Sequence, residues 1–277
     1  MKQLILQLIK KDMIKTILVT AFLAITYTTS AQNSTNSLSG YYKVTKKDAL
    51  YTSIHLDGNG HALISDSFQA EYFQKDDLLY VFPDKSVFIF KIDKNQLKGI
   101  SNWVAKSTYK KTVVPLNDDY ERNFNTYVVN PNLLYEFYML NFEEGTDEMK
   151  LDVLNDPEAY NEQLEKLCAK GLTSACGALF GMKYMEAAGG LSEILSDNAT
   201  TIKEDKQLEK LAQQMIDAED FRGYSLLGSY YYALGNISKA KKIYTEGAEK
   251  GDEQSALVLF SLELEEDVET TESEFVE

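Results

Sequence analysis

The stretch FQAEYFQKDDLLYVF, Phe68 to Phe82, decides the fold of the first half of this sequence. Aromatic and aliphatic residues form two short blocks in it, and the polar run Lys75 to Asp77 separates them. Blocks of this length and composition, divided by turn residues, predict two antiparallel strands joined by a short loop.

The same pattern extends from Gly40 to Thr112, where about eight such blocks follow one another with turn residues between them. A single flat sheet of this size would leave an apolar face bare, so we expect a small antiparallel β-barrel or half-barrel. The opening Gly-Tyr strand, the strand that meets an Asp-Gly turn and the closing TYKK strand are similar to those of lipocalin-like domains of exported bacterial proteins. This resemblance implies an interior that holds a small apolar molecule. The candidate pocket residues are Tyr72, Tyr80, Phe82, Phe88 and Phe90.

Residues 1–31 have the order of a secretory signal peptide: lysines, the apolar run Ile17 to Ile25, and small residues up to Ala31. The apolar run is about half the roughly 20 residues that a membrane-spanning helix needs. We expect cleavage after Ala31, no stable membrane anchor afterwards, and a secreted or periplasmic protein. A retained N-terminal anchor is the alternative, and Met13 is an alternative start to Met1.

The formal net charge is −15, and removing residues 1–31 would remove four lysines and one aspartate and leave −18. A surface this acidic repels phosphate backbones and anionic lipid head groups. The charge therefore disfavours nucleic acid and peripheral membranes as partners.

After Asn155 the apolar period becomes that of helices. Asp156 followed by Pro157 predicts a helix N-terminus, and Gly171 predicts its end. Three stretches further along can be aligned, and small residues recur in them at intervals of 48 and 32 residues, with a leucine four places later. A period in the thirties is typical of helix-hairpin repeats. The aligned small residues are Ala175, Gly223 and Ser255, and the leucines are Leu179, Leu227 and Leu259.

The segment from Gly223 to Ala256 resembles a Sel1-like repeat, a relative of the tetratricopeptide repeat, although Ser238 replaces the family's usual aspartate. The resemblance implies a helical hairpin-repeat domain that binds another polypeptide in an extended groove. Matching positions are Leu227-Gly228, Tyr231, Leu234-Gly235, Lys239-Ala240, Tyr244, Ala248-Glu249 and Gly251. Candidate partner-binding residues are Tyr231, Tyr232 and Tyr244. Since consecutive helical residues point about 100° apart, one of Tyr230 to Tyr232 should face a groove or solvent.

The predicted fold class is α+β with two domains, a small antiparallel β-barrel or half-barrel followed by an α-helical hairpin-repeat domain of the Sel1 or tetratricopeptide type. The predicted organisation is a signal peptide (1–31), a flexible N-terminus (32–39), a β-domain (40–112), a linker with a helix at Asn130 to Phe142 (113–155), Sel1-like repeats (156–262) and an acidic disordered tail (263–277).

The two cysteines of the chain, Cys168 and Cys176, are eight residues apart. On one continuous helix their Cα atoms would be about 12 Å apart, too far for a disulfide, but a chain reversal at Gly171 would bring them together. A disulfide, two free thiols and a metal or catalytic pair all stay open at this point. The spacing C-x-x-G-x-x-x-x-C is similar to that of secreted cysteine-rich Sel1-like proteins, and this resemblance implies a disulfide.

Candidate catalytic chemistry is sparse. His55 and His61 flank the tight turn Asp57 to Gly60, and a two-residue turn would place their rings on opposite faces as exposed side chains. Ser107 to Lys110 (STYK) and Ser196 to Asn198 (SDN) match two motifs of serine β-lactamases, but the first falls on a predicted strand. We predict no catalytic, cofactor-binding or metal-binding residue and no cofactor.

These features predict an exported, non-enzymatic interaction protein whose helical repeats bind another polypeptide. The alternative is a carrier that holds a small apolar ligand in the β-domain. A serine hydrolase is third.

Overall fold

The computed structural model describes residues 38–83, 86–114, 124–150, 155–190 and 202–274, with side chains described up to residue 263. Thr35–Glu277 form one compact unit. The predicted signal peptide, its cleavage site and the SDN motif lie outside the described residues. Within the described residues, no helix is both long enough and apolar enough to cross a bilayer.

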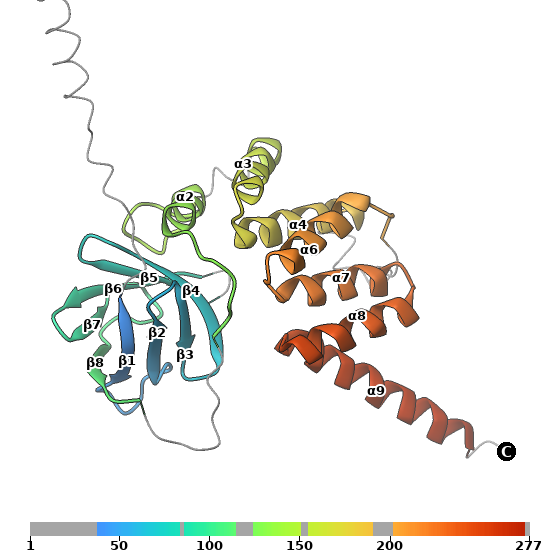
Figure 1. Ribbon diagram of the computed structural model, residues 1–277, viewed down its shortest axis with the longest axis horizontal. Helices are drawn as coiled ribbons and strands as arrows, with labels where there is room; N and C mark the ends of the chain where they lie inside the picture. The colour runs from blue at the N-terminus through green and yellow to red at the C-terminus, as the bar shows by residue number, and fades with distance from the viewer. Residues whose placement is uncertain (1–37, 84–85, 115–123, 151–154, 191–201, 275–277) are drawn as a thin grey trace, which may run out of the picture. The chain divides into compact units, whose positions relative to one another are not determined.

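Eight antiparallel strands within the described residues close into a barrel, in which each strand pairs with the next along the chain (Figure 1). The first strand also pairs with the last, with Tyr41 opposite Thr112, which closes the barrel. The number and order of the strands agree with the sequence, and the barrel is closed and not half-open. The strands are β1 (Ser39–Val44), β2 (Ser53–Asp57), β3 (His61–Ile64), β4 (Phe68–Lys75), β5 (Leu78–Phe82), β6 (Phe88–Asp93), β7 (Gln96–Gly99) and β8 (Thr108–Thr112).

Residues of β5 alternate between two hydrophobic cores because successive side chains of a strand point to opposite faces. Leu79 and Val81 belong to the core that also contains Tyr72, Phe88 and Phe90. Tyr80 and Phe82 belong to a different core. The wall formed by β4, β5 and β6 is therefore apolar on both faces.

Helix α2 (Pro131–Asn141) covers the second face of that wall. It begins where the sequence predicted, with Pro131 at its first turn and the Asn130 side chain accepting hydrogen bonds from the backbone of Asn132 and Leu133. The ring of Tyr138 lies 4.8 Å from the ring of Tyr80 and 6.1 Å from that of Phe73. The large apolar side chains on this face of the barrel are thus buried by a helix of the same chain.

Six helices follow in the described residues, and each contacts the next. The first of them begins and ends as predicted, with the Asp156 side chain capping its N-terminus and Gly171 beyond its end at a φ of +96°. They are α3 (Pro157–Ala169), α4 (Thr173–Ala187), α6 (Lys206–Asp217), α7 (Arg222–Ala233), α8 (Ile237–Lys250) and α9 (Glu253–Glu274).

The predicted fold class is wrong for this half of the chain, because no helical hairpin-repeat domain is evident among the described residues. The residues that follow the aligned leucines have different surroundings: Phe180, after Leu179, is 3% exposed, whereas Phe260, after Leu259, is 60% exposed. The aligned position between them, Gly228, lies so close to α8 that an added Cβ would be 2.4 Å from the Tyr244 ring. Small residues and leucines recur wherever helices pack closely, so their spacing alone does not define a repeat.

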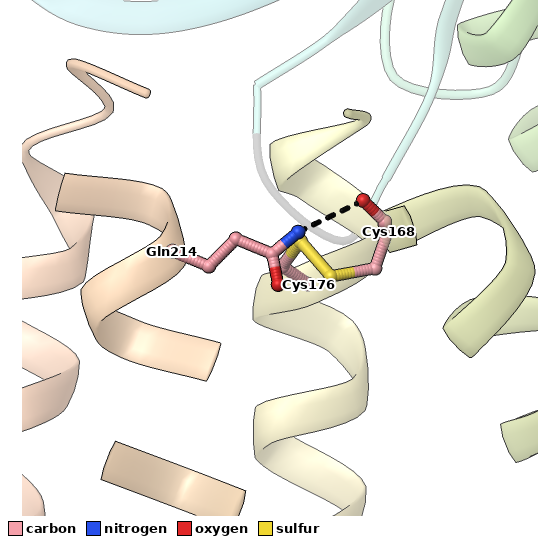
Figure 2. Close-up of a disulfide and its surroundings, with 3 residues drawn as sticks. All are labelled: Cys168, Cys176 and Gln214. Carbon is pink, nitrogen blue, oxygen red and sulfur yellow. Dashed lines mark hydrogen bonds between the residues drawn. A yellow bond between two sulfur atoms is a disulfide. The ribbon is translucent and has the colours of Figure 1, made fainter. Parts of the chain in front are cut away.

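Cys168 at the end of α3 and Cys176 in α4 form a disulfide, with their Cα atoms 4.8 Å apart (Figure 2). The reversal at Gly171 makes this approach possible. The side-chain amide of Gln214, on α6, donates a hydrogen bond of 3.1 Å to the backbone carbonyl of Cys168 (Figure 2). The disulfide thus joins two helices, and a third helix is bound beside it.

Helix α9 differs from the prediction at its C-terminal end. The sequence predicted a disordered tail from residue 263, whereas the helix continues to Glu274. Glutamate has a good helix propensity, which favours continuation even where the helix has no apolar stripe.

Candidate functional site

The three consecutive tyrosines of α7 have different surroundings, as their helical spacing predicts. Tyr230 is buried and its hydroxyl accepts a hydrogen bond from the backbone N–H of Asp205. Tyr231 is also buried, whereas Tyr232 is 43% exposed. Of the predicted partner-binding residues, Tyr232 is thus the one that presents its ring to solvent.

Tyr232 lines a hollow of about 280 Å³ between α7, α8 and α9. Tyr244 of α8 also lines it, and because this residue is only 2% exposed it forms part of the floor. The lining carries no charged side chain. The remaining lining residues, all from α9, are Gln254, Leu257, Val258, Ser261 and Leu262.

Beside the hollow, α9 presents two large apolar side chains to solvent. Leu257 is 62% exposed and Phe260 is 60% exposed, and residues three apart on a helix are neighbours on its surface. We call the hollow together with Phe260 the α9 surface. Its exposed members are the aromatic ring of Tyr232 on α7, the two apolar side chains on α9 and the uncharged polar side chains of Gln254 and Ser261.

The third predicted partner-binding residue, Tyr231, lines a different hollow, a groove of about 560 Å³ formed by α6, α7 and α8. Its hydroxyl donates a hydrogen bond to Glu209, and the ammonium of Lys239 lies 3.8 Å from the centre of its ring. Burial raises the pKa of Tyr231, and the hydrogen bond to Glu209 raises it further. The structure therefore separates Tyr231 from Tyr232 and Tyr244. The polar groups that line the groove already contact one another, which makes this groove the weaker candidate for a binding site.

A polar cluster that the sequence did not predict lies where β4 meets the starts of α4 and α7. Glu71 is 3% exposed, and Arg222 donates a hydrogen bond of 3.0 Å from Nη2 to its Oε1. The same carboxylate accepts hydrogen bonds from the hydroxyls of Tyr127, at 2.7 Å, and Ser174, at 2.6 Å. Arg222 also binds Asp220, with Nε 2.8 Å from Oδ1 and Nη2 2.6 Å from Oδ2.

These contacts fit a structural role better than a catalytic one. The Glu71 carboxylate already accepts hydrogen bonds from Arg222, Tyr127 and Ser174, and these bonds hold β4 to the starts of α4 and α7. Burial raises the pKa of Tyr127 well above its usual range, and the charge of Glu71 raises it further, so this phenol stays protonated. One sequence signal was available: Arg222 is one of two arginines in the chain, and it follows Asp220 closely.

The histidines do not have the predicted arrangement. Leu56 pairs with Ala62 and not with His61, so the loop is one residue longer than predicted and both rings fall on the same face of the sheet. His61 is 2% exposed and its Nε2 lies 2.7 Å from the backbone carbonyl of Tyr127, so the prediction that it is an exposed hairpin residue is wrong. The turn itself is tight, with Asp57 Oδ1 accepting hydrogen bonds from the backbone of Asn59 and His61.

Other predicted groups are not brought together as one site. In the part of the chain that the structure describes, no group of three or more His, Cys, Asp or Glu side chains could hold a metal ion. The STYK motif lies at and before β8, a strand. Of the predicted pocket residues, Tyr72, Phe88 and Phe90 share one core, while Tyr80 and Phe82 pack in the core that includes α2. They do not line one common interior.

No protein-family model, curated protein or solved structure matches this chain. The resemblances to Sel1-like repeats and to lipocalin-like domains therefore stay predictions. The described residues provide two candidate sites, the α9 surface and the groove around Tyr231, and the first is the more accessible and the more apolar.

Proposed function

We propose that this protein binds another polypeptide through the α9 surface. The observation that carries the proposal is the joint exposure of Leu257 and Phe260 beside an uncharged hollow with Tyr232 at its rim. Aromatic side chains such as those of Tyr232 and Phe260 are enriched at protein interfaces, and the apolar area of Leu257 beside them adds to what a partner can bury.

Burial of the apolar side chains of the α9 surface by a partner would lower the free energy. Full burial of a leucine or phenylalanine side chain stabilises a complex by about 1.5–3 kcal/mol relative to leaving it in water. Contiguous exposed apolar groups with polar surroundings mark interaction sites more often than scattered single residues do.

The proposed location is secreted or periplasmic. The Cys168–Cys176 disulfide is compatible with an oxidising compartment. The formal charge of −15 supports a protein partner over nucleic acid or an anionic membrane. We propose a binding role without catalysis.

The test is site-specific photo-crosslinking in the exported fraction of the cells that make the protein. A photoreactive phenylalanine analogue replaces Phe260 in one variant and Trp103, which is 57% exposed on the barrel side of the chain, in the control. We expect one dominant adduct of constant mass from position 260 and none from position 103. A third variant with Leu257→Glu, which places a charge in the hollow, should lose the adduct. Equal crosslinking from both positions, or none from 260, would refute the proposal.

A further inference from the structure

The charge of α9 changes abruptly along its length. From Gln254 to Leu262 the helix is apolar or neutral, and this part contributes the α9 residues of the α9 surface. From Glu263 to Glu274 the sequence has seven acidic residues and no Lys or Arg, and the backbone remains helical throughout. An apolar contact region is thus continued along the same helix axis by a strongly acidic one.

This distribution of charge destabilises the helix itself in two ways. Like charges three or four positions apart on a helix repel each other, and Glu265 and Glu269 are one such pair by position. Acidic residues near a helix C-terminus also oppose the helix dipole, whose negative end lies there. Both effects would be relieved by cations brought alongside the helix.

We infer that the segment which binds the α9 surface is amphipathic and basic, with apolar side chains that enter the hollow and Lys or Arg side chains that lie along the acidic half of α9. This inference rests on the proposed function and names the chemistry of the partner. The distance to be covered, from Leu257 to Glu274, is about 25 Å at 1.5 Å per helical residue, so about 18 residues of a helical partner suffice.

A second copy of the chain is a poorer occupant of the same surface. Pairing two α9 helices in parallel would bring together two acidic halves that contain no base, and in either orientation two copies that each carry a formal charge of −15 repel each other. Anionic lipid and nucleic acid are disfavoured for the same reason. Charge complementarity therefore favours a basic polypeptide.

The test uses two labelled peptides of about 18 residues with the same amphipathic leucine pattern, one with lysine and one with glutamine at the polar positions. Each is titrated by fluorescence anisotropy against the disulfide-bonded chain without residues 1–31. We expect the lysine peptide to bind saturably and at least ~10-fold more tightly than the glutamine peptide at low salt, and to lose that advantage at about 1 M salt.

Two variants separate the apolar from the charged contribution. Leu257→Ser with Phe260→Ser should abolish binding of both peptides. Glu265→Gln with Glu269→Gln and Glu272→Gln should weaken only the lysine peptide. If the lysine peptide binds the double serine variant as tightly as the parent chain, the inference is overturned. Such binding would be a general attraction to an acidic protein.

The remaining outcomes distinguish the two proposals. Equal binding of both peptides would refute the basic partner and leave the proposed function standing. If neither peptide binds while the crosslink from position 260 persists, the basic partner is again refuted and the proposed function stands. Failure of both peptides and of the crosslink would refute both proposals. A dimer in light scattering that the two serine substitutions convert to a monomer would identify a second copy as the occupant and overturn the inference.

Discussion

The outer wall of the barrel at β4–β6 and the α9 surface both carry large apolar side chains, but they differ in what covers them. On the wall, Phe73 and Tyr80 are almost fully buried because α2 places Tyr138 against them. On α9, Leu257 and Phe260 are more than half exposed, and no described element of the chain covers them. The first apolar face stabilises the fold, and the second is available to a partner.

The largest effect should come from removing the cover on the wall. Tyr138→Ala leaves a cavity against Tyr80 and Phe73 and should lower the free energy of unfolding by about 3–5 kcal/mol. The matched change on the other face, Phe260→Ala, should alter it by less than about 0.5 kcal/mol. Urea denaturation followed by circular dichroism measures both. Equal losses would show that the two faces do not differ as described.

A somewhat smaller effect is expected at the polar cluster. Arg222→Met leaves two buried carboxylates, Glu71 and Asp220, without their cation. Unpairing a fully buried ion pair costs 3–5 kcal/mol, and because the Arg222 side chain is 44% exposed we expect about 3 kcal/mol. The double variant with Glu71→Gln should recover part of that loss in urea denaturation. If Arg222→Met is as stable as the parent chain, the polar cluster does not stabilise the fold.

Loss of the disulfide should follow in size. Closing an eight-residue separation contributes about 2 to 3 kcal/mol in the chain-entropy model, so Cys168→Ser with Cys176→Ser should lower the unfolding free energy by that amount. Binding at the α9 surface should not change, since neither residue lines it. A variant that lost peptide binding while remaining folded would contradict this separation.

The smallest effect should be a loss of stability at alkaline pH. It tests whether Tyr138 is buried against the barrel wall that α2 covers. Burial raises the pKa of Tyr138 to about 12, so the folded chain holds this proton more tightly than the unfolded chain. The stabilisation is complete below pH 10 and is lost as the pH rises from about 10 to 12. Tyr138→Phe should remove about one proton from the slope of stability against pH in that range. Urea titrations at several pH values would give the slope, and an unchanged slope would contradict the burial of this phenol.

Sequence reasoning was sufficient for features that depend on local patterns. The alternation of apolar residues predicted eight antiparallel strands, and the capping residue Asp156 followed by Pro157 marked one helix start. The pairing of Cys168 with Cys176 was one of several alternatives from the residues alone and was implied by a resemblance. These features require only a few neighbouring residues to specify them.

Features that depend on distant residues were missed or mistaken. The contact of Glu71 with Arg222 joins residues 151 positions apart, and no local pattern encodes it. The longer loop after Asp57 shifted the strand register by one residue and reversed the predicted side of His61. Recurring leucines and small residues were interpreted as a repeat, but close helix packing produces the same spacing. Tyr232 and Phe260 became candidates together only when their exposures were known.

The most direct test of the central claim compares stability with binding in one double variant, Leu257→Ser with Phe260→Ser. If the α9 surface is an uncovered binding face, the free energy of unfolding changes by less than about 0.5 kcal/mol per substitution, while the lysine peptide no longer binds. If the unfolding free energy falls by several kcal/mol and the peptide still binds, these side chains belong to the folded core, and the proposed function is contradicted.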